Sequence, residues 1–133
     1  MNRICIVVSR SLNAGQKANI AAILAGQLVK DAPFLYEASV LDKSGINHSG
    51  IASNIVVLDG GSGQLLSLIN DVRENELVYS VFSSTGQSLS NNYPEYRQQI
   101  SSMDTKAAGI IGVGLAGEDS IVRLLTKKFS LMK

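Results

Sequence analysis

Residues 3–30 read RICIVVSRSLNAGQKANIAAILAGQLVK, and this stretch decides the fold. It begins with an apolar run, Ile4–Val8, in which every residue except Cys5 is β-branched. Apolar residues at consecutive positions are typical of a central strand that is covered on both faces. A polar loop, Ser9–Gly15, follows the run and leads into a long segment that is almost free of charge. We therefore interpret the stretch as a buried strand, a loop and a buried helix.

The segment Gln16–Lys30 predicts a helix that is apolar nearly all round and lies in the middle of the domain. Ser11 or Asn13 caps its start in this interpretation, because either side chain can accept a bond from a free backbone N–H. The other free N–H groups, with Arg10 and Lys17 nearby, favour an anion site. The alternative is an ordinary capped helix with solvated cations.

The rest of the chain alternates strands with helices. Apolar runs predict strands at residues 55–58, 77–82 and 107–115, with a shorter extended segment at 35–41. Helical spacing predicts a helix that Ser62 caps and that ends near Glu74, and further helices at 91–103 and 118–127. Residues 42–50 read DKSGINHSG, a run of turn formers that indicates a loop. The alternation indicates one three-layer α/β/α domain over residues 1–133.

Composition and charge exclude several classes of protein. The net charge is +1 and no basic run exceeds Lys127–Lys128, so an extended nucleic-acid surface is not expected. A single buried cysteine, Cys5, and a single histidine argue against a disulfide, a transition-metal site or a metal cofactor. The chain begins directly with the first strand and has no apolar segment long enough to span a membrane, so we expect a cytoplasmic protein without a signal peptide.

Residues 112–117 read GVGLAG and match the pattern G-x-G-x-x-G of dinucleotide-binding proteins. The pattern lacks its context here, since no βαβ unit and no acidic residue about 20 positions later follow it. We expect instead that Gly112 and Gly114 let a helix pack close to the strand, and that Gly117 makes a turn.

The opening, IVVSRSLNAGQKANIAAILA, resembles the strand–loop–helix start of type II peptidyl-tRNA hydrolases, and the end, AAGIIGVGLAGEDSIVRLLTKKFSLM, resembles their last strand and helix. A closer match is an uncharacterised family of related fold, a domain of unknown function. The chain resembles that family at Asn19, at Gln87 and in the loop that holds Asp42, Gly45, His48, Gly50 and Ile51. The resemblance implies a four-stranded mixed sheet of order 2-1-4-3, with helices on both faces, and a homodimer.

The chemistry of the hydrolases does not transfer to this sequence. Their catalytic lysine falls at Asn19 and their histidine at Gly26, while Lys17 lies two residues away and points elsewhere on a helix. Their D-A-G-R-T-Q segment falls at residues 82–87, where the aspartate is lost, the threonine becomes Gly86 and only Gln87 remains. Hydrolysis of the ester between peptide and tRNA needs an activated nucleophile and an oxyanion donor. The charged groups expected to supply them are absent from these positions.

A polar cleft is the first candidate site. The implied fold brings together the first loop, the start of the first helix and the loop after the third strand, with Ser9, Arg10, Lys17, Asn19, Ser83, Ser84, Thr85 and Gln87 as ligand-binding candidates. Hydroxyls and amides without a carboxylate suit binding better than proton transfer. The alternative is that Ser83–Thr85 only satisfy a turn by local bonds.

Asp42, Ser44 and His48 form a second constellation. A histidine can act as a base near neutral pH, and a carboxylate can orient it. Three such residues within one loop do not have the usual catalytic spacing, so His48 and Asp42 are weak catalytic candidates. The alternatives are a turn-forming role for Asp42 and Ser44, and a ligand or dimer contact for His48.

Three functions follow from these observations. We favour a binding module, descended from the hydrolase fold, that recognises a small molecule or the end of a tRNA without a cofactor. The second is an enzyme, either a residual peptidyl-tRNA hydrolase or another hydrolase that uses His48 with Asp42. The third is an interaction protein whose role lies in its dimer surface.

Overall fold

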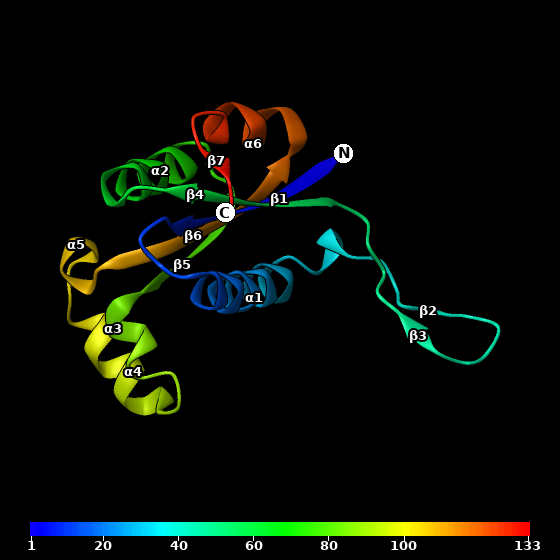
Figure 1. Ribbon diagram of the computed structural model, residues 1–133, viewed down its shortest axis with the longest axis horizontal. Helices are drawn as coiled ribbons and strands as arrows, with labels where there is room; N and C mark the ends of the chain where they lie inside the picture. The colour runs from blue at the N-terminus through cyan, green and yellow to red at the C-terminus, as the bar shows by residue number, and fades with distance from the viewer.

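The computed structural model describes all residues, 1–133, and has a five-stranded sheet with helices on both faces (Figure 1). The strands of the sheet are β1 (Asn2–Ser9), β4 (Asn54–Gly60), β5 (Val78–Ser83), β6 (Ile110–Glu118) and β7 (Ser130–Leu131). Their order is β5-β6-β1-β4-β7. β1 runs parallel to β4 and antiparallel to β6, so the sheet is mixed.

The sheet has five strands, and the expectation of four is wrong. The additional strand, β7, has two residues and pairs antiparallel with β4, where Ser130 is opposite Asp59. Phe129 immediately before it is buried in the core and fixes the chain against this edge. A strand this short leaves no alternating pattern in the sequence, which is why it was missed.

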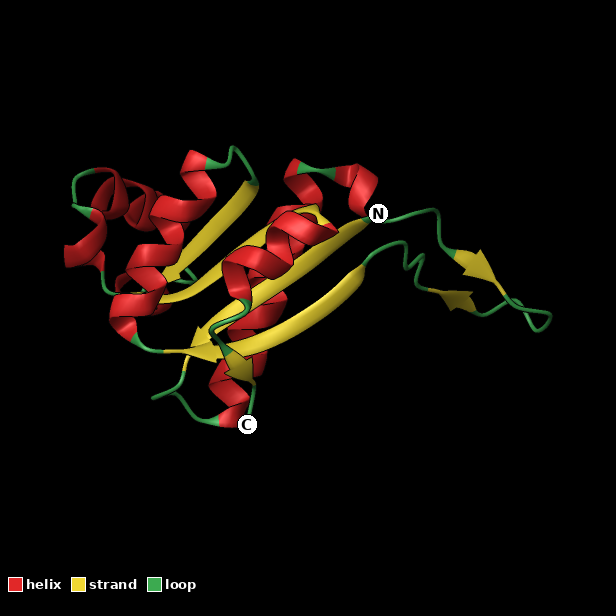
Figure 2. Ribbon diagram, turned by 90° about the horizontal axis from the view of Figure 1, so that it is seen from above, coloured by secondary structure: helices red, strands yellow, loops and turns green.

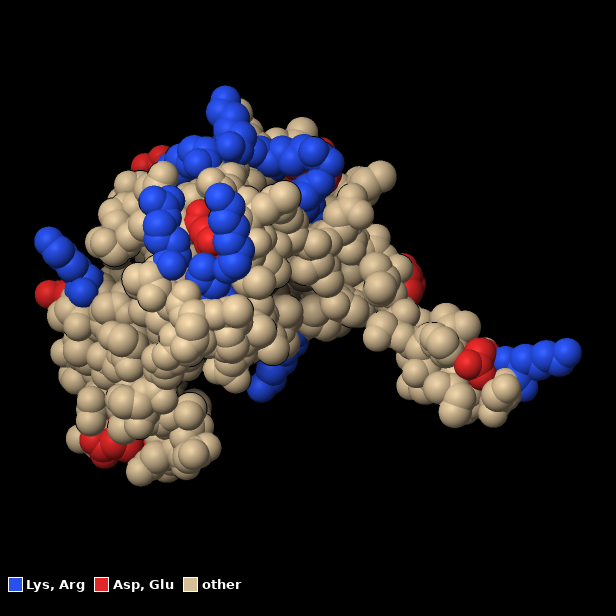
Figure 3. Space-filling model, viewed as in Figure 1, with Lys and Arg blue, Asp and Glu red and all other residues tan.

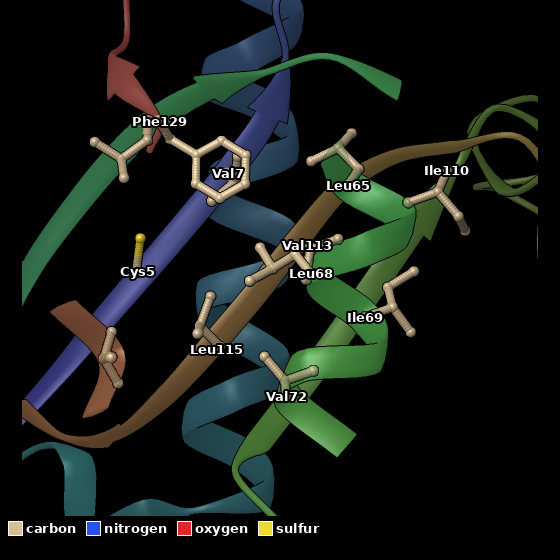
Figure 4. Close-up of a cluster of buried hydrophobic side chains, with 12 residues drawn as sticks. Cys5, Val7, Leu65, Leu68, Ile69, Val72, Ile110, Val113, Leu115 and Phe129 are labelled. Atoms are coloured by element: carbon tan, nitrogen blue, oxygen red, sulfur yellow. The ribbon is translucent and has the colours of Figure 1, made fainter. Parts of the chain in front are cut away.

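β1 is an interior strand, as predicted, and its side chains alternate between two cores. Ile4, Ile6 and Val8 pack against α1 (Ala14–Asp31). Cys5 and Val7 face the opposite way, toward the core in which α2 (Ser62–Glu74) and α6 (Asp119–Thr126) pack on the sheet (Figure 4). The apolar run thus covers both faces of the strand, which explains its lack of polar residues.

The expectation that α1 is apolar and buried nearly all round is wrong. Its buried positions are Lys17, Ile20, Leu24 and Leu28, while Ile23 is 37% exposed. The outer side consists largely of alanine, glycine and amide residues. The low charge of this helix therefore reflects its small and uncharged side chains and not burial on every side. Of the two predicted caps, Ser11 and Asn13, the structure has Asn13, whose side chain accepts a bond of 2.9 Å from the Gln16 N–H.

All three glycines of the G-x-G-x-x-G pattern lie inside β6. A Cβ on Gly112 would lie 2.7 Å from the Ile20 side chain, and one on Gly114 would lie 3.0 Å from Leu28. Both glycines therefore let α1 pack close to the strand, as expected. Gly117 does not make a turn, since the strand continues through Glu118 and Gly117 faces Leu77.

The predicted loop at 42–50 is part of a hairpin that projects from the body (Figures 1 and 2). A 3₁₀ turn, η1 (Pro33–Leu35), leads into strands β2 (Val40–Leu41) and β3 (Asn47–His48). At the opposite end of the molecule lie three short helices, α3 (Ser84–Gln87), α4 (Tyr93–Ser101) and α5 (Thr105–Ala108) (Figure 1). None of the helices is both long and apolar enough to cross a membrane.

Candidate functional site

The carboxyl ends of β1 and β4 form the first place where a site can be built. The two strands are parallel neighbours, and each is followed by a helix, β1 after a short loop and β4 after Gly61. The helices leave on opposite faces, with α1 below the sheet and α2 above it in Figure 1. Two adjacent parallel strands whose helices diverge leave a crevice outside their carboxyl ends, and ligands of open α/β sheets bind at such switch points.

Lys17 and Asp59 form a buried ion pair in this crevice. Lys17 lies in the second turn of α1, and Asp59 lies near the end of β4 on the face that α1 covers. The Lys17 Nζ lies 3.1 Å from each carboxylate oxygen of Asp59, and the two side chains are only 5% and 9% exposed. Only Oδ2 is oriented to accept a hydrogen bond from Nζ, so Oδ1 is a buried acceptor without a hydrogen-bond donor.

The last residue of the chain completes the cluster. The Lys133 N–H donates to Asp59 Oδ2 at 3.2 Å, and the Lys133 carbonyl oxygen accepts from Lys17 Nζ at 3.2 Å. A hollow of about 250 Å³ lies here and is lined by Arg10, Asp59, Ser130 and Lys133. Figure 3 shows basic side chains gathered around the C-terminus on this face. The hollow thus combines the Asp59 carboxylate with two basic residues, Arg10 and Lys133, beside the main-chain oxygen of Lys133.

The start of α2 adds free backbone donors to the crevice. Its N-cap is Gly61 rather than Ser62, so no side chain caps the first turn. The Gln64 Oε1 instead accepts from the Gly61 N–H at 2.9 Å and from Arg10 Nη2 at 3.4 Å. An uncapped helix start beside an exposed guanidinium is a favourable environment for an anion.

The structure brings together only part of the predicted polar cleft. Ser9 ends β1 with its Oγ 2.9 Å from the Ser11 Oγ, and Arg10 and Lys17 lie in the crevice. Asn19 lies on the exposed outer side of α1. Lys17 points toward Asp59, so its partner lies on β4 and not in the loop between β1 and α1.

The loop after β5 is separate from the crevice. β6 lies between β5 and β1, so the ends of β5 and β1 are about two strand spacings, roughly 10 Å, apart. Ser83 Oγ accepts from the Gly86 N–H, while Ser84 and Thr85 donate to the Ala108 carbonyl oxygen. Ser83 thus stabilises the turn locally, as in the alternative to ligand binding, whereas Ser84 and Thr85 connect the turn to α5. Gln87 is half-buried at the end of α3.

Asp42 and His48 lie on the projecting hairpin. The His48 Nε2 lies 2.8 Å from Asp42 Oδ2, and Asp42 Oδ1 accepts from the backbone N–H groups of Ser44 and Ile46. The hydrogen bond with His48, followed by that from Ile46, lowers the pKa of Asp42 below its ordinary value of 3.8. Ser44 thus takes part through its backbone N–H, and neither Asp42 nor His48 lines the hollow beside Lys133 or the groove between α1, β5 and α4.

Sequence reasoning missed Asp59, Gln64 and Lys133. Asp59 lies immediately after the predicted strand at residues 55–58, and a carboxylate next to Val-Val-Leu in a buried strand is itself a signal. Gln64 and Lys133 carried no signal, because their roles depend on which strands are neighbours. No group of three or more His, Cys, Asp or Glu side chains is placed to hold a metal ion.

Comparison with known proteins identifies the family. Residues 2–133 match the family described as "Protein of unknown function (DUF2000)". The chain belongs to the DUF2000 family. No curated protein matches the sequence. A solved structure of a protein of unknown function from Agrobacterium tumefaciens is similar to this DUF2000 chain, with a TM-score of 0.85 and 20% sequence identity over 99% of this chain and 98% of the other. At this identity the likeness shows a shared fold.

Proposed function

We propose that this DUF2000 chain is a binding module with the peptidyl-tRNA hydrolase II-like fold, and that its ligand is a small anionic molecule or the end of an RNA. The fold part of the proposal is supported by the four longer strands, which lie in the order β4-β1-β6-β5 with helices on both faces. The binding part is supported by the crevice at the carboxyl ends of β1 and β4.

The observation that carries the proposal is the Lys17–Asp59 pair. Burying a charged pair costs free energy, and apolar residues of the same size are often at least as stable. The pair also leaves Asp59 Oδ1 without a hydrogen-bond donor, although buried polar atoms are nearly always bonded. We take the pair as support for a binding site rather than for a purely structural role.

The crevice favours a ligand with two kinds of polar group. Arg10 and the uncapped start of α2 favour a phosphate or carboxylate. Asp59 favours a neighbouring hydroxyl or amino group that donates to its carboxylate. A terminal ribose with its phosphate has both groups, and so does an aminoacyl compound.

A ligand screen by thermal unfolding tests this proposal. The probes are nucleotides, aminoacyl compounds and unfractionated tRNA, added to the full chain. A ligand at about 100 times its dissociation constant stabilises the folded state by about 2.7 kcal/mol, which raises the melting temperature by several degrees. Arg10→Ala removes the exposed guanidinium of the crevice, and we expect it to abolish the shift.

Arg97→Ala is the matched control, because Arg97 is an exposed arginine on α4, outside the crevice. It should keep the full shift. The proposal is rejected if no probe in the three groups stabilises the chain, or if the two arginine variants respond alike.

The hydrolase alternative has one supporting observation. Lys17 places a buried ammonium group at the crevice, and an ammonium can stabilise a developing oxyanion. Release of peptide from peptidyl-tRNA, measured for wild type, Lys17→Met, His48→Ala and Asn19→Ala, tests it. Background rates in all four chains would remove this alternative without affecting the binding proposal.

A further inference from the structure

The projecting hairpin, the arm (residues 36–51), is ordered by hydrogen bonds at its base and at its tip. At its base, Tyr36 bridges to Ile51 and the Glu37 N–H donates to the Gly50 carbonyl oxygen at 2.9 Å. At its tip, Asp42 binds the backbone of Ser44 and Ile46. The arm therefore holds a defined shape, although two strands of two residues each are not stable alone in water.

The arm exposes aliphatic side chains that nothing in the chain covers. Val40, Leu41, Ile46 and Ile51 are between 60% and 72% exposed. Figures 1 and 3 show the arm extending away from the body along the longest axis, so no other part of the chain packs on its outer half. Ordered aliphatic residues in such a position indicate a contact surface.

The total surface of the chain indicates how large that contact is. The accessible surface is 7948 Å² for a chain of 14.1 kDa. A compact monomer of this mass exposes about 6,700 Å², so this chain exposes roughly 1,200 Å² more than expected. A standard interface buries about 800 Å² of each partner. The excess is comparable with the area that each chain contributes to a standard interface.

A complementary surface lies at the other end of the molecule. A groove of about 320 Å³ lies between α1, β5 and α4, with Ile23, Phe82, Tyr93 and Tyr96 among its walls. No charged residue lines it, and β5 is the edge of the sheet, so the groove also borders an unpaired strand. An apolar groove beside a free edge suits an extended segment with aliphatic side chains.

The arm and the groove of one chain cannot meet, because they lie at opposite ends of its longest axis (Figure 1). A two-fold axis perpendicular to that axis places each arm near the groove of the other chain, and both contacts then form at once. We propose that the arm docks in the α1–β5–α4 groove of a second copy of this chain, and that the exchange is reciprocal. This inference is independent of the ligand proposed for the crevice.

Sedimentation velocity across dilution tests the role of the arm. Wild type is expected at about twice 14.1 kDa, and the variant Leu41→Lys/Ile46→Lys as a monomer, with its dimer dissociation constant raised at least tenfold. Both positions are exposed, so the fold should survive, and circular dichroism checks this. Leu124→Lys is the control, since Leu124 is a similarly exposed leucine on α6, away from both arm and groove.

A cross-link tests which surface receives the arm. Leu41→Cys and Tyr93→Cys are made as separate chains and mixed under mild oxidation, while Cys5 is buried and should stay reduced. The expected main product is the mixed disulfide dimer, which mass spectrometry distinguishes from either homodimer. A main product of two Leu41→Cys chains would mean that arms pair with arms, and would overturn the groove assignment.

Two sedimentation results would also overturn the inference. One is a wild-type monomer at every concentration, which would leave the arm to a different protein. The other is a dimer that persists in the folded Leu41→Lys/Ile46→Lys variant, which would place the interface elsewhere.

Discussion

The ammonium of Lys17 lies 3.1 Å from both carboxylate oxygens of Asp59, 42 residues further along the chain. The pair joins α1 to β4, and almost no water reaches either side chain. In such surroundings each charge is stabilised chiefly by the other.

The first prediction concerns the stability of this pair. Lys17→Met leaves the Asp59 carboxylate buried without its counter-charge, and Asp59→Leu does the same to Lys17. Each single change is expected to lower the free energy of unfolding by about 3–5 kcal/mol. The double variant should lose far less than the sum, because two apolar residues leave no charge unpaired. Urea unfolding near neutral pH measures all four chains.

Lys30→Met is the control for the loss of a lysine, since Lys30 is exposed on the same helix. It should change the free energy of unfolding by no more than about 0.5 kcal/mol. Additive losses at Lys17 and Asp59 would mean that the two charges are not coupled.

Local patterns predicted the elements of this fold well. The run Ile4–Val8 predicted an interior strand because both of its faces are apolar, and the polar loop predicted the cap at Asn13. Both depend on residues close together in sequence. The burial of Lys17 depends instead on residues far apart in sequence. It requires β1 and β4 to be neighbours, and it requires α1 to pack where Lys17 can reach Asp59.

The features that the sequence did not predict also depend on residues outside the local pattern. The sequence predicts that Ser83–Thr85 face a cleft, but Ser84 and Thr85 donate to the Ala108 carbonyl oxygen, more than 20 residues away. Residues 42–50 of the arm predict a loop because turn formers dominate there, and strands of two residues each leave no pattern to detect. Both features depend on contacts between separate segments of the chain, which no local pattern encodes.

The second prediction concerns the tip of the arm. Hydrogen bonds, above all that with His48, lower the pKa of Asp42. A lowered pKa means that the carboxylate stabilises the turn above its ordinary value of 3.8, and that this support is lost as the pH falls through and below it. Asp42→Ala should therefore raise the exchange rates of the Ser44 and Ile46 amides by roughly fivefold at neutral pH.

Hydrogen exchange followed by NMR measures this change, and the amides of β1 provide the internal reference. They should exchange at the wild-type rate, because Asp42 and the tip of the arm make no part of the core. Unchanged exchange at Ser44 and Ile46 would show that the backbone turn, with Gly45 in the left-handed conformation, holds the tip without the carboxylate.

The third prediction concerns Cys5. Burial raises the pKa of its thiol to about 12 from an ordinary value of 9.0, because the thiolate cannot be hydrated in the core. The native chain should not react with a thiol reagent at mildly alkaline pH, whereas the unfolded chain should react at once. The raised pKa also predicts that stability falls as the pH rises from 9.0 toward 12. Labelling of the native chain at the rate of a free thiol would contradict this account.

The last prediction compares two glycines that differ in what surrounds them. A Cβ on Gly112 would lie 2.7 Å from the Ile20 Cγ2 and 3.0 Å from the Leu24 Cδ1, so Gly112→Ala forces α1 away from β6. Such overpacking costs about 1–3 kcal/mol. Gly26 lies inside α1 with nothing within 4 Å of its Cβ position, and Gly26→Ala should stabilise the chain by about 0.5–1 kcal/mol. Urea unfolding should thus give opposite signs for the same substitution, and equal effects would refute the close approach of α1 to β6.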